Sequence, residues 1–482
     1  MKLIRYFLFF FFLTGSAVFA DAYHNINGFF GERAAGLAGA YSAISDDPSG
    51  AFYNPAGIGF AYDNSISISA SNYKIINKSY KDVDSPNQSY SQTSRSYLPN
   101  FIGIVSNSGD LKIAFSVVNQ INENYSRNDQ ISIPVYSSSI NNTKIYNIEN
   151  YSHLQFGPSF GYKLGERLSV GMTLYFFENT QSITRSTMQQ YTDNSYVMVS
   201  DVDNRRTLGL NPIFGIQFMP MDKLSLGFSV RRNVVTARNR LISQVYTDSL
   251  RAGNTHNIDF TEGTHHFNGS VESGILKMKA LPTGEIPQNN EFRAGVASFL
   301  TRDFMMAFDI IHSEGYVKKQ NQIELAFQGP KTKVTWNNPE IQELTLKPTT
   351  NFAFGMEYYL TTNLALLGGV FTNYSNAKEV KWEESAFQLA GKALLGSEYS
   401  SKASEDLTLA YAYPEFRNNP RKEFVNNLGY SVGISFASAK ASISLTLIRE
   451  KGLGQSRIDY NSLSQQFQYN STSIYLVASS RN

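Results

Sequence analysis

The strongest constraint on this chain is a two-residue alternation of apolar and small polar side chains that recurs along most of its length. Such an alternation indicates a β-strand whose two faces meet different environments. A soluble sandwich usually places charged residues on its outer face, whereas here the second face carries Ser, Gly and Thr. Large apolar residues on one face and small polar ones on the other are typical of a transmembrane β-barrel. The clearest run sets Val170, Met172, Leu174 and Phe176 against Ser169, Gly171, Thr173 and Tyr175.

The spacing of these runs predicts about fourteen antiparallel strands, each long enough to cross a bilayer at a tilt. Short turns, such as Ser108–Asp110 and Gly165–Arg167, alternate with long loops, of which Thr236–Asn290 and Ser375–Val425 are the longest. This alternation of connections marks bacterial outer-membrane barrels, and soluble sandwiches and propellers have no reason to show it. The predicted strands are 63–75, 97–107, 111–122, 151–163, 168–181, 206–218, 223–235, 291–301, 303–315, 349–360, 363–374, 426–437, 440–451 and 472–480.

The composition agrees with a membrane barrel and excludes several other classes. Charged residues make up 17% of the 482 residues, against about 25% in a soluble globular protein. The net charge of +2 gives no strong field for nucleic acid. The chain has 0 cysteines, which excludes disulfide frameworks, thiolate metal sites and a cysteine-linked lipid anchor.

Residues 1–20 have the form of a secretory signal peptide. Lys2 and Arg5 precede an apolar run, and small residues end at Ala20. The run is shorter than the roughly 20 residues that span a bilayer, so we expect cleavage after Ala20 rather than an anchor. Residues 21–60 follow without alternation, and residues 61–482 hold the strands and long loops. A barrel of about fourteen strands is too wide for its wall side chains to fill. We therefore predict that residues 21–60 form a hatch, or plug, inside it.

The predicted hatch also carries a motif. A run of Gly and Ala leads to the acidic pair Asp46 and Asp47, and then to Asn54-Pro55-Ala56-Gly57 just before the first predicted strand. This order resembles the N-terminal hatch of the FadL family of outer-membrane transporters of long-chain fatty acids and aromatic hydrocarbons. The clear motif covers roughly forty residues, and the architecture covers the whole chain. A weaker resemblance lies in Leu276–Pro282 and Phe292–Ala297.

The resemblance implies a monomeric fourteen-strand barrel, a hatch that includes Asn54, Pro55, Ala56 and Gly57, and external loops that catch the ligand. It also implies a lateral gap in the wall, formed in the family at a kinked third strand. The third strand predicted here, 111–122, contains neither Gly nor Pro. The nearest breakers are Pro99 and Gly103 in the second strand and Pro158 in the fourth, so the resemblance leaves the exit route open.

Candidate ligand contacts come from two places. The alternation turns Arg231 and Arg293 toward the lumen, together with Asp309 and Glu357, although a slip of one residue would reverse each assignment. An inward arginine could hold a fatty carboxylate. The alternative is ion pairing within the lumen or with the hatch, which is usual for charges in such places. The loop before the predicted eighth strand adds apolar residues: Ile275, Leu276, Met278 and Leu281.

The sequence predicts no enzyme, and no catalytic, metal or cofactor site. Gly157–Gly161 matches a nucleophile elbow, but that motif requires a strand-to-helix turn and Ser159 falls in mid-strand. His256, His265 and His266 share one long loop without carboxylates at ligand spacing.

The favoured function is transport of long-chain fatty acids or similar hydrophobic compounds across the bacterial outer membrane, with membrane lipid and the transported compound as partners. The alternative is a PorV-like outer-membrane barrel that serves protein secretion as a binding or shuttle component, because such barrels carry a similar hatch motif. An unplugged porin would not need the hatch, and a barrel enzyme would need an inward His near an acid or Ser.

Overall fold

The computed structural model describes residues 24–61, 64–81, 89–97, 99–131, 140–191, 196–248, 263–267, 270–280, 286–319, 323–328, 333–338, 343–377, 424–456 and 465–481. No helix among these residues is long and apolar enough to cross a membrane.

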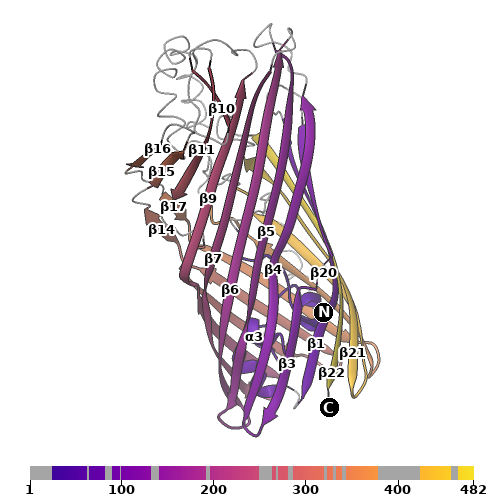
Figure 1. Ribbon diagram of the computed structural model, residues 1–482. Coiled ribbons are helices and arrows are strands. Elements are labelled where there is room, and N and C mark those ends of the chain that lie inside the picture. The colour runs from indigo at the N-terminus through magenta and orange to yellow at the C-terminus, as the bar shows by residue number, and fades with distance from the viewer. Residues whose placement is uncertain are drawn as a thin grey trace.

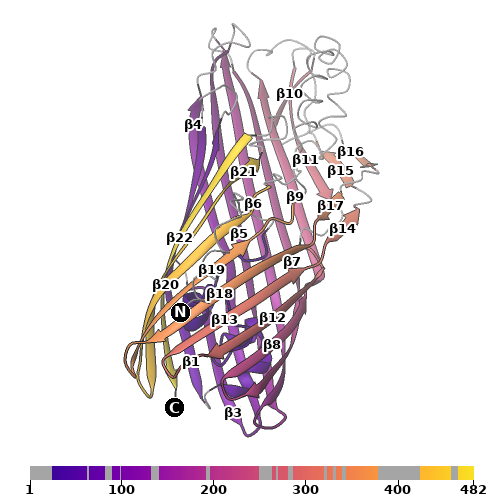
Figure 2. The same cartoon turned by 180° about the vertical axis from the view of Figure 1, so that it is seen from behind.

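The wall of the molecule is a closed 14-stranded antiparallel barrel, which confirms the predicted fold class (Figures 1 and 2). The ring closes where the first strand pairs with the last, from Ser65 opposite Arg481 to Tyr80 opposite Phe467. Twelve positions in the ring are single strands. They are β1 (Ser65–Lys81), β4 (Leu111–Ile131), β5 (Ile140–Lys163), β6 (Leu168–Tyr191), β7 (Tyr196–Met221), β12 (Asn290–Phe299), β13 (Phe304–Ser313), β18 (Thr349–Tyr359), β19 (Leu364–Asn373), β20 (Asn427–Ala437), β21 (Ala441–Ser456) and β22 (Gln465–Arg481).

Each of the two remaining positions is filled by two strands in succession. β2 (Ser89–Ser96) and β3 (Phe101–Ser108) both pair with β1 and with β4. β8 (Leu224–Arg232) and β9 (Val234–Asp248) both pair with β7. The short connections gather at one end of the barrel, where the C-terminus also lies (Figure 1).

Further strands lie beyond the barrel at the opposite end (Figure 1). β10 (Gly263–Phe267), β11 (Ser270–Ala280), β15 (Ile323–Gln328) and β16 (Lys333–Asn338) continue the sheet from β9. β14 (Tyr316–Lys319) and β17 (Glu343–Leu346) form a separate pair. The sequence interpretation placed these residues in loops, because their runs are short and polar.

The alternation seen in the sequence separates an apolar outer face from a polar lumen. On β6, Met172 and Phe176 are exposed on the outside, whereas Ser169, Thr173 and Tyr175 are buried inside. The same division holds around the ring, where Phe, Ile, Leu and Met side chains form an outward apolar band. A lipid bilayer is the environment in which such a band is favourable.

The four strands β4–β7 extend far beyond the apolar band at the long-loop end (Figure 1). β6, for example, ends at Tyr191 rather than at the predicted residue 181. Its additional part reads Gln-Ser-Ile-Thr-Arg-Ser-Thr-Met-Gln-Gln-Tyr and has polar residues on both faces. The alternation disappears where a strand leaves the membrane, because neither face then requires apolar side chains.

The N-terminal segment, residues 24–61, lies inside the barrel near the short-turn end (Figure 1). It contains the helices α2 (Glu32–Gly36) and α3 (Gly50–Tyr53) and the 3-10 helix η1 (Pro55–Phe60). Phe30, Leu37, Tyr41 and Tyr53 are almost completely buried and join wall side chains in one apolar cluster.

Candidate functional site

The motif Asn54-Pro55-Ala56-Gly57 attaches the N-terminal segment to the barrel wall. Pro55 restricts Asn54 to an extended backbone, with φ −152° and ψ 102°. In this position the Asn54 amide donates to the carbonyl of Ser42 at 2.8 Å and to the carbonyl of Ile216 in β7 at 3.1 Å. Its own oxygen accepts from Ala56 N at 3.2 Å and so caps η1. One side chain therefore joins two parts of the segment and the wall.

The wall meets this motif with glycines, which permit close backbone approach. A Cβ placed on Gly215 would lie 2.0 Å from Asn54 Oδ1, and one on Gly171 would lie 2.3 Å from the carbonyl carbon of Pro55. Both distances are too short for any side chain. The glycines of β6 and β7 thus form a surface that fits the motif.

The rest of the segment meets wall glycines in the same way. A Cβ on Gly227 would lie 2.0 Å from the Ser42 carbonyl oxygen, and one on Gly355 would lie 2.7 Å from Leu37 Cβ. Gly369 in β19 would meet Ala38 Cβ at 2.8 Å. The N-terminal segment is therefore fitted closely to the wall over much of the ring.

We expect Gly369→Ala to lower the free energy of unfolding of the barrel by ~1–3 kcal/mol, the usual cost of over-packing a buried contact. The midpoint of thermal unfolding should fall with it. Gly368→Ala in the same strand is the matched control, because its Cβ would meet nothing closer than 3.8 Å. The measurement is the temperature at which the folded barrel loses its compact mobility in gel electrophoresis. Equal midpoints for the two variants would show that the segment does not press on β19.

A first cluster of charges links the segment to β18. Arg33 donates to Asp46 at 2.8 Å and to Glu357 at 2.8 Å. Burial alone would lower the pKa of Arg33, but the two carboxylates outweigh it and raise that pKa above its usual value. Next to this cluster, burial raises the pKa of Asp47 to about 6, although Ser49 donates to it. The Glu357 side of this cluster is buried, whereas the Asp46 side chain is 37% exposed.

A second cluster lies on β8 and β12. Glu291 pairs with Arg293 at 2.8 Å and with Arg231 at 3.3 Å. Arg231 also donates to the carbonyl of Phe52 in α3, and its guanidinium lies 4.3 Å from the centre of the Phe52 ring. The carboxylate of Glu291 thus pairs with both arginines, and the N-terminal segment adds the Phe52 carbonyl as an acceptor for Arg231.

Asp309 on β13 holds the middle of the segment by its backbone. Its Oδ2 accepts from Ser42 N at 2.9 Å and from Tyr41 N at 3.1 Å. At the short-turn end, Glu32 accepts from Ser435 and Ser442, each at 2.5 Å. The segment is therefore held by side-chain contacts from many strands and is not part of the wall sheet.

The wall is interrupted between β2 and β3, where Tyr97, Pro99 and Asn100 belong to neither strand, although the Asn100 carbonyl still accepts from Asn119 N of β4 at 2.8 Å. Lys74–Lys81 of β1 pair with β2, and Ser65–Ile68 pair with β3. Between these blocks, the described residues of β2 and β3 provide no ladder partner for positions 69–73. Both neighbouring strands change register here, β1 at Ser69/Ser71 and β4 at Asn119/Ile121. Pro99, which lacks a backbone N–H, lies within the interruption.

The first described residues of the segment lie directly behind this interruption. Asn100 Nδ2 donates to the carbonyl of Phe29 at 2.7 Å. Lys74 Nζ donates to the carbonyl of Asn27 at 3.2 Å. Because Asn100 and Lys74 stand on opposite sides of the interruption, residues 27–29 bridge it from the lumen.

An aromatic cluster of buried side chains lies on the lumen side of the wall next to this point, toward the long-loop end. We call it the upper aromatic cluster. Tyr151 packs against it, Lys78 Nζ lies 5.1 Å from the centre of its Tyr125 ring, and His24 contacts the Val425 carbonyl at 2.7 Å. Its buried members are Ile76, Tyr80, Tyr90, Tyr125, Val425, Phe467 and Tyr469.

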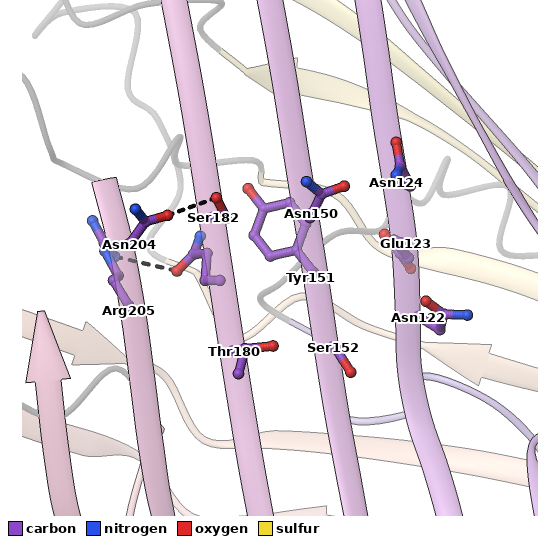
Figure 3. A pocket seen from close by; sticks show the side chains of 11 residues that line it. Asn122, Glu123, Asn124, Asn150, Tyr151, Ser152, Thr180, Ser182, Asn204 and Arg205 are labelled. Carbon is purple, nitrogen blue, oxygen red and sulfur yellow. Dashed lines mark hydrogen bonds between the residues drawn. The ribbon is translucent and has the colours of Figure 1, made fainter. Parts of the chain in front are cut away.

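A separate, polar cavity of about 300 Å³ lies on β4–β7 (Figure 3). Its lining includes an amide or hydroxyl from each of the four strands, as with Asn124, Asn150, Ser182 and Asn204. Sequence reasoning did not identify it, because Asn and Ser in long polar stretches give no distinctive spacing.

The amino-acid sequence matches no protein-family model, and no curated protein is similar to it. Solved structures do match it along nearly its whole length. The P. putida toluene transporter TodX aligns with a TM-score of 0.61 at 12% identity, covering 95% of this chain and 99% of its own. This chain has a FadL-type fold. A Pseudomonas aeruginosa FadL homologue gives a TM-score of 0.55 at 13% identity, covering 96% and 99% of the two chains. The CymD monoaromatic hydrocarbon channel gives 0.55 at 14% identity, covering 95% and 98%.

Within this FadL-type fold, the inward charges lie as the alternation predicts. Arg231, Arg293, Asp309 and Glu357 are all buried in the lumen, where they pair with Glu291 or with the N-terminal segment. Sequence reasoning missed Glu291. The sequence could have predicted it, because Glu291 stands two residues before Arg293 and therefore on the same, lumen-facing side of β12.

The structure places the predicted apolar ligand contacts in a strand, where the sequence had predicted a loop. Ile275, Leu276 and Met278 belong to strand β11 and not to a loop, since residues 276–278 pair with β9 and 275–280 with β15. Leu281 lies outside the described residues. The prediction of a loop was wrong because alternation is weak in short strands beyond the membrane.

The structure gives the serine and histidines that were weighed as a nucleophile and as metal ligands no catalytic or metal-binding arrangement among the described residues. Ser159 is buried in β5 and its Oγ accepts from Thr173 at 2.8 Å. His265 and His266 lie in β10, and His256 lies outside the described residues. Among the part of the chain that the structure describes, no three His, Asp or Glu side chains are grouped as metal ligands.

Proposed function

We propose that this barrel carries hydrophobic small molecules, long-chain fatty acids foremost, inward across the bacterial outer membrane after export by its signal peptide. One observation carries the proposal: residues 27–29 of the N-terminal segment bridge the wall interruption from the lumen, and His24 of the same segment contacts Val425 of the upper aromatic cluster. A shift of these residues would open the way from the cluster to the interruption, where the rings of Tyr73 and Tyr97 lie 4.9 Å apart. The solved channels of similar fold, titled as toluene transporters and hydrocarbon channels, support this class of ligand.

Capture is favourable because the upper aromatic cluster offers an apolar site above the plug. Each buried CH₂ contributes roughly 0.8 kcal/mol, so a long acyl chain gains strongly on leaving water. An aqueous pore would provide no such gain. The polar lipopolysaccharide leaflet opposes the same molecule, which explains why a protein route is needed.

Release requires a second arrangement of the N-terminal segment that is close in free energy to the first. The segment contacts the wall mainly through side chains, so shifting it breaks individual hydrogen bonds and leaves the wall ladder intact. Lys74 and Asn100 hold residues 27–29 by only two described hydrogen bonds. We propose that this end moves and exposes the interruption, which serves as the lateral exit.

Arg231 is our candidate for the ligand carboxylate, with Arg293 beside it. In the structure the Arg231 guanidinium contacts the Phe52 carbonyl and shares Glu291 with Arg293. If the segment shifts, the Phe52 contact is lost and a carboxylate can replace it. Since an anion binds a guanidinium more strongly than a neutral carbonyl does, a fatty acid would favour the shifted arrangement.

The test is uptake of radiolabelled oleate by cells whose only barrel of this kind is the present protein. We expect Asn54→Ala to bind oleate but to take it up several-fold more slowly, because the loss of two donated hydrogen bonds disturbs the seat of the segment. Asn64→Ala is the matched control, since Asn64 is exposed and accepts one long contact, from Asn107 N at 3.4 Å.

Equal uptake of oleate, other fatty acids and aromatic hydrocarbons with and without the protein would contradict the transport proposal. The PorV-like secretion role would then become the leading explanation. A defect in the export of secreted proteins from the same cells would support that role.

A further inference from the structure

The polar cavity on β4–β7 is built from three rows of residues that run across the strands. Strand pairing places Glu123, Tyr151, Gln181 and Arg205 in the middle row. Within the cavity lining the two flanking rows carry only amides and hydroxyls, and the charged Arg206 pairs with Thr180 at the end of the first row, outside the lining. One consists of Asn122, Ser152 and Thr180, and the other of Asn124, Asn150, Ser182 and Asn204.

The two kinds of row face opposite sides of the wall. Arg205 is buried and donates to Gln181 at 3.3 Å on the lumen side, whereas Asn124 and Asn204 are exposed. Successive residues of a strand point to opposite faces, so both flanking rows point outward. Seven of the eleven lining residues therefore face outward and border a groove on the outer face of the wall, and the middle row, Glu123, Tyr151, Gln181 and Arg205, completes the lining between them (Figure 3). We call the seven outward residues the outer groove.

The outer groove lies just above the apolar band. Phe156 and Phe176 are the last exposed aromatic pair on β5 and β6, with ring centroids 6.1 Å apart. At the next outward position Glu178 pairs with Arg206 at 2.6 Å, which marks the polar boundary. Thr180 follows two residues later, so the groove begins roughly 10 Å beyond the aromatic pair on a tilted strand. This is the level of lipid head groups.

The chemistry of the outer groove fits a neutral, hydroxyl-rich ligand. Its side chains are four Asn, two Ser and one Thr, which both donate and accept hydrogen bonds and carry no charge. Asn150 Oδ1 is enclosed and accepts no hydrogen bond from the described residues. A volume of about 300 Å³ is at the small end of ligand sites, which favours a single sugar over a long chain.

We propose that the outer groove binds a sugar of the saccharide head group of an outer-leaflet glycolipid. Its continuity with the apolar band selects a membrane glycolipid over a soluble saccharide, because acyl chains on the band and sugars in the groove would be satisfied together. The proposal rests on the outer-membrane placement given above. It adds a fixed lipid ligand on the outside of the wall, separate from the transported compound.

The experiment measures glycolipid binding to the full, folded chain in phospholipid nanodiscs by native mass spectrometry. The probes are lipopolysaccharide with a complete core saccharide and lipid A with the same acyl chains and phosphates. We expect the wild-type chain to retain the core-bearing form and Asn124→Ala/Asn150→Ala to bind it about tenfold more weakly, through two lost amide contacts. Asn77→Ala, an exposed amide on β1, is the control and should bind like wild type.

Equal retention by the double variant and wild type overturns the proposal, as does equal binding of lipid A and the core-bearing form. Full-affinity binding of the free core oligosaccharide would overturn the choice of a membrane ligand. Heat-modifiable gel mobility verifies that each variant is folded. Because no transport is measured, failure here is distinguishable from failure of oleate uptake.

Discussion

Deletion of residues 22–59 is expected to turn a nearly silent protein into a conducting channel. A 14-stranded wall encloses more space than its own side chains fill. The space at the short-turn end is taken by Phe30, Leu37, Tyr41 and Tyr53 of the N-terminal segment, all almost completely buried. Single-channel recordings in planar bilayers provide the measurement, with the full chain reconstituted in parallel.

The deleted barrel should still fold, because every wall strand keeps its neighbours. Asp309 and Glu357 lose their partners in the segment, but the water that replaces it can solvate them. Circular dichroism with unchanged strand content checks this point. If the deleted and full-length proteins conduct equally, the segment does not seal the pore.

The barrel could be predicted from the sequence because a membrane imposes a repeating requirement on every crossing strand. Residues such as Met172 and Phe176 face lipid, and Ser169 and Thr173 face the lumen, wherever the strand lies in the ring. β2 gives no such signal, since Ser-Tyr-Ser-Gln-Thr-Ser-Arg-Ser contains one large apolar residue. The wall interruption next to it therefore remained undefined, although Pro99 was a correct indication of a break.

The contacts inside the lumen were only partly predictable, for a different reason. Alternation shows that Arg231 and Arg293 point inward, but their partners depend on how the segment folds across the lumen. The Phe52 carbonyl is 179 residues away from Arg231 in the sequence. Likewise, the sequence does not show why Gly215 and Gly227 must be glycine. The reason appears only when the fold places Asn54 and Ser42 against them. The strands of the wall can therefore be predicted from local alternation, whereas the contacts between the N-terminal segment and the wall depend on the whole fold.

Locking the N-terminal segment to the wall should stop transport without preventing capture. Gly36 in α2 and Leu367 in β19 are neighbouring positions, because a Cβ on Gly36 would lie 2.8 Å from Leu367 Cβ. Replacing Leu367 by Cys removes its Cγ and Cδ atoms but keeps its Cβ. A disulfide needs about 3.8 Å between Cβ atoms, so the two backbones must separate by about 1 Å to admit the bond. The chain has 0 cysteines, so Gly36→Cys/Leu367→Cys introduces a single thiol pair.

We expect oleate uptake by the oxidised double variant to fall about tenfold or more, since a covalent bond removes the second arrangement on which release depends. Oleate should still bind, and a reducing agent should restore uptake. Ala297→Cys/Ala307→Cys is the matched control, because it joins the paired strands β12 and β13 and leaves the segment free. Uptake by the locked barrel at the rate of this control would show that the ligand passes to the interruption without movement of α2. A motion of the whole segment would then be excluded, and any shift would be confined to residues before α2, such as 27–29.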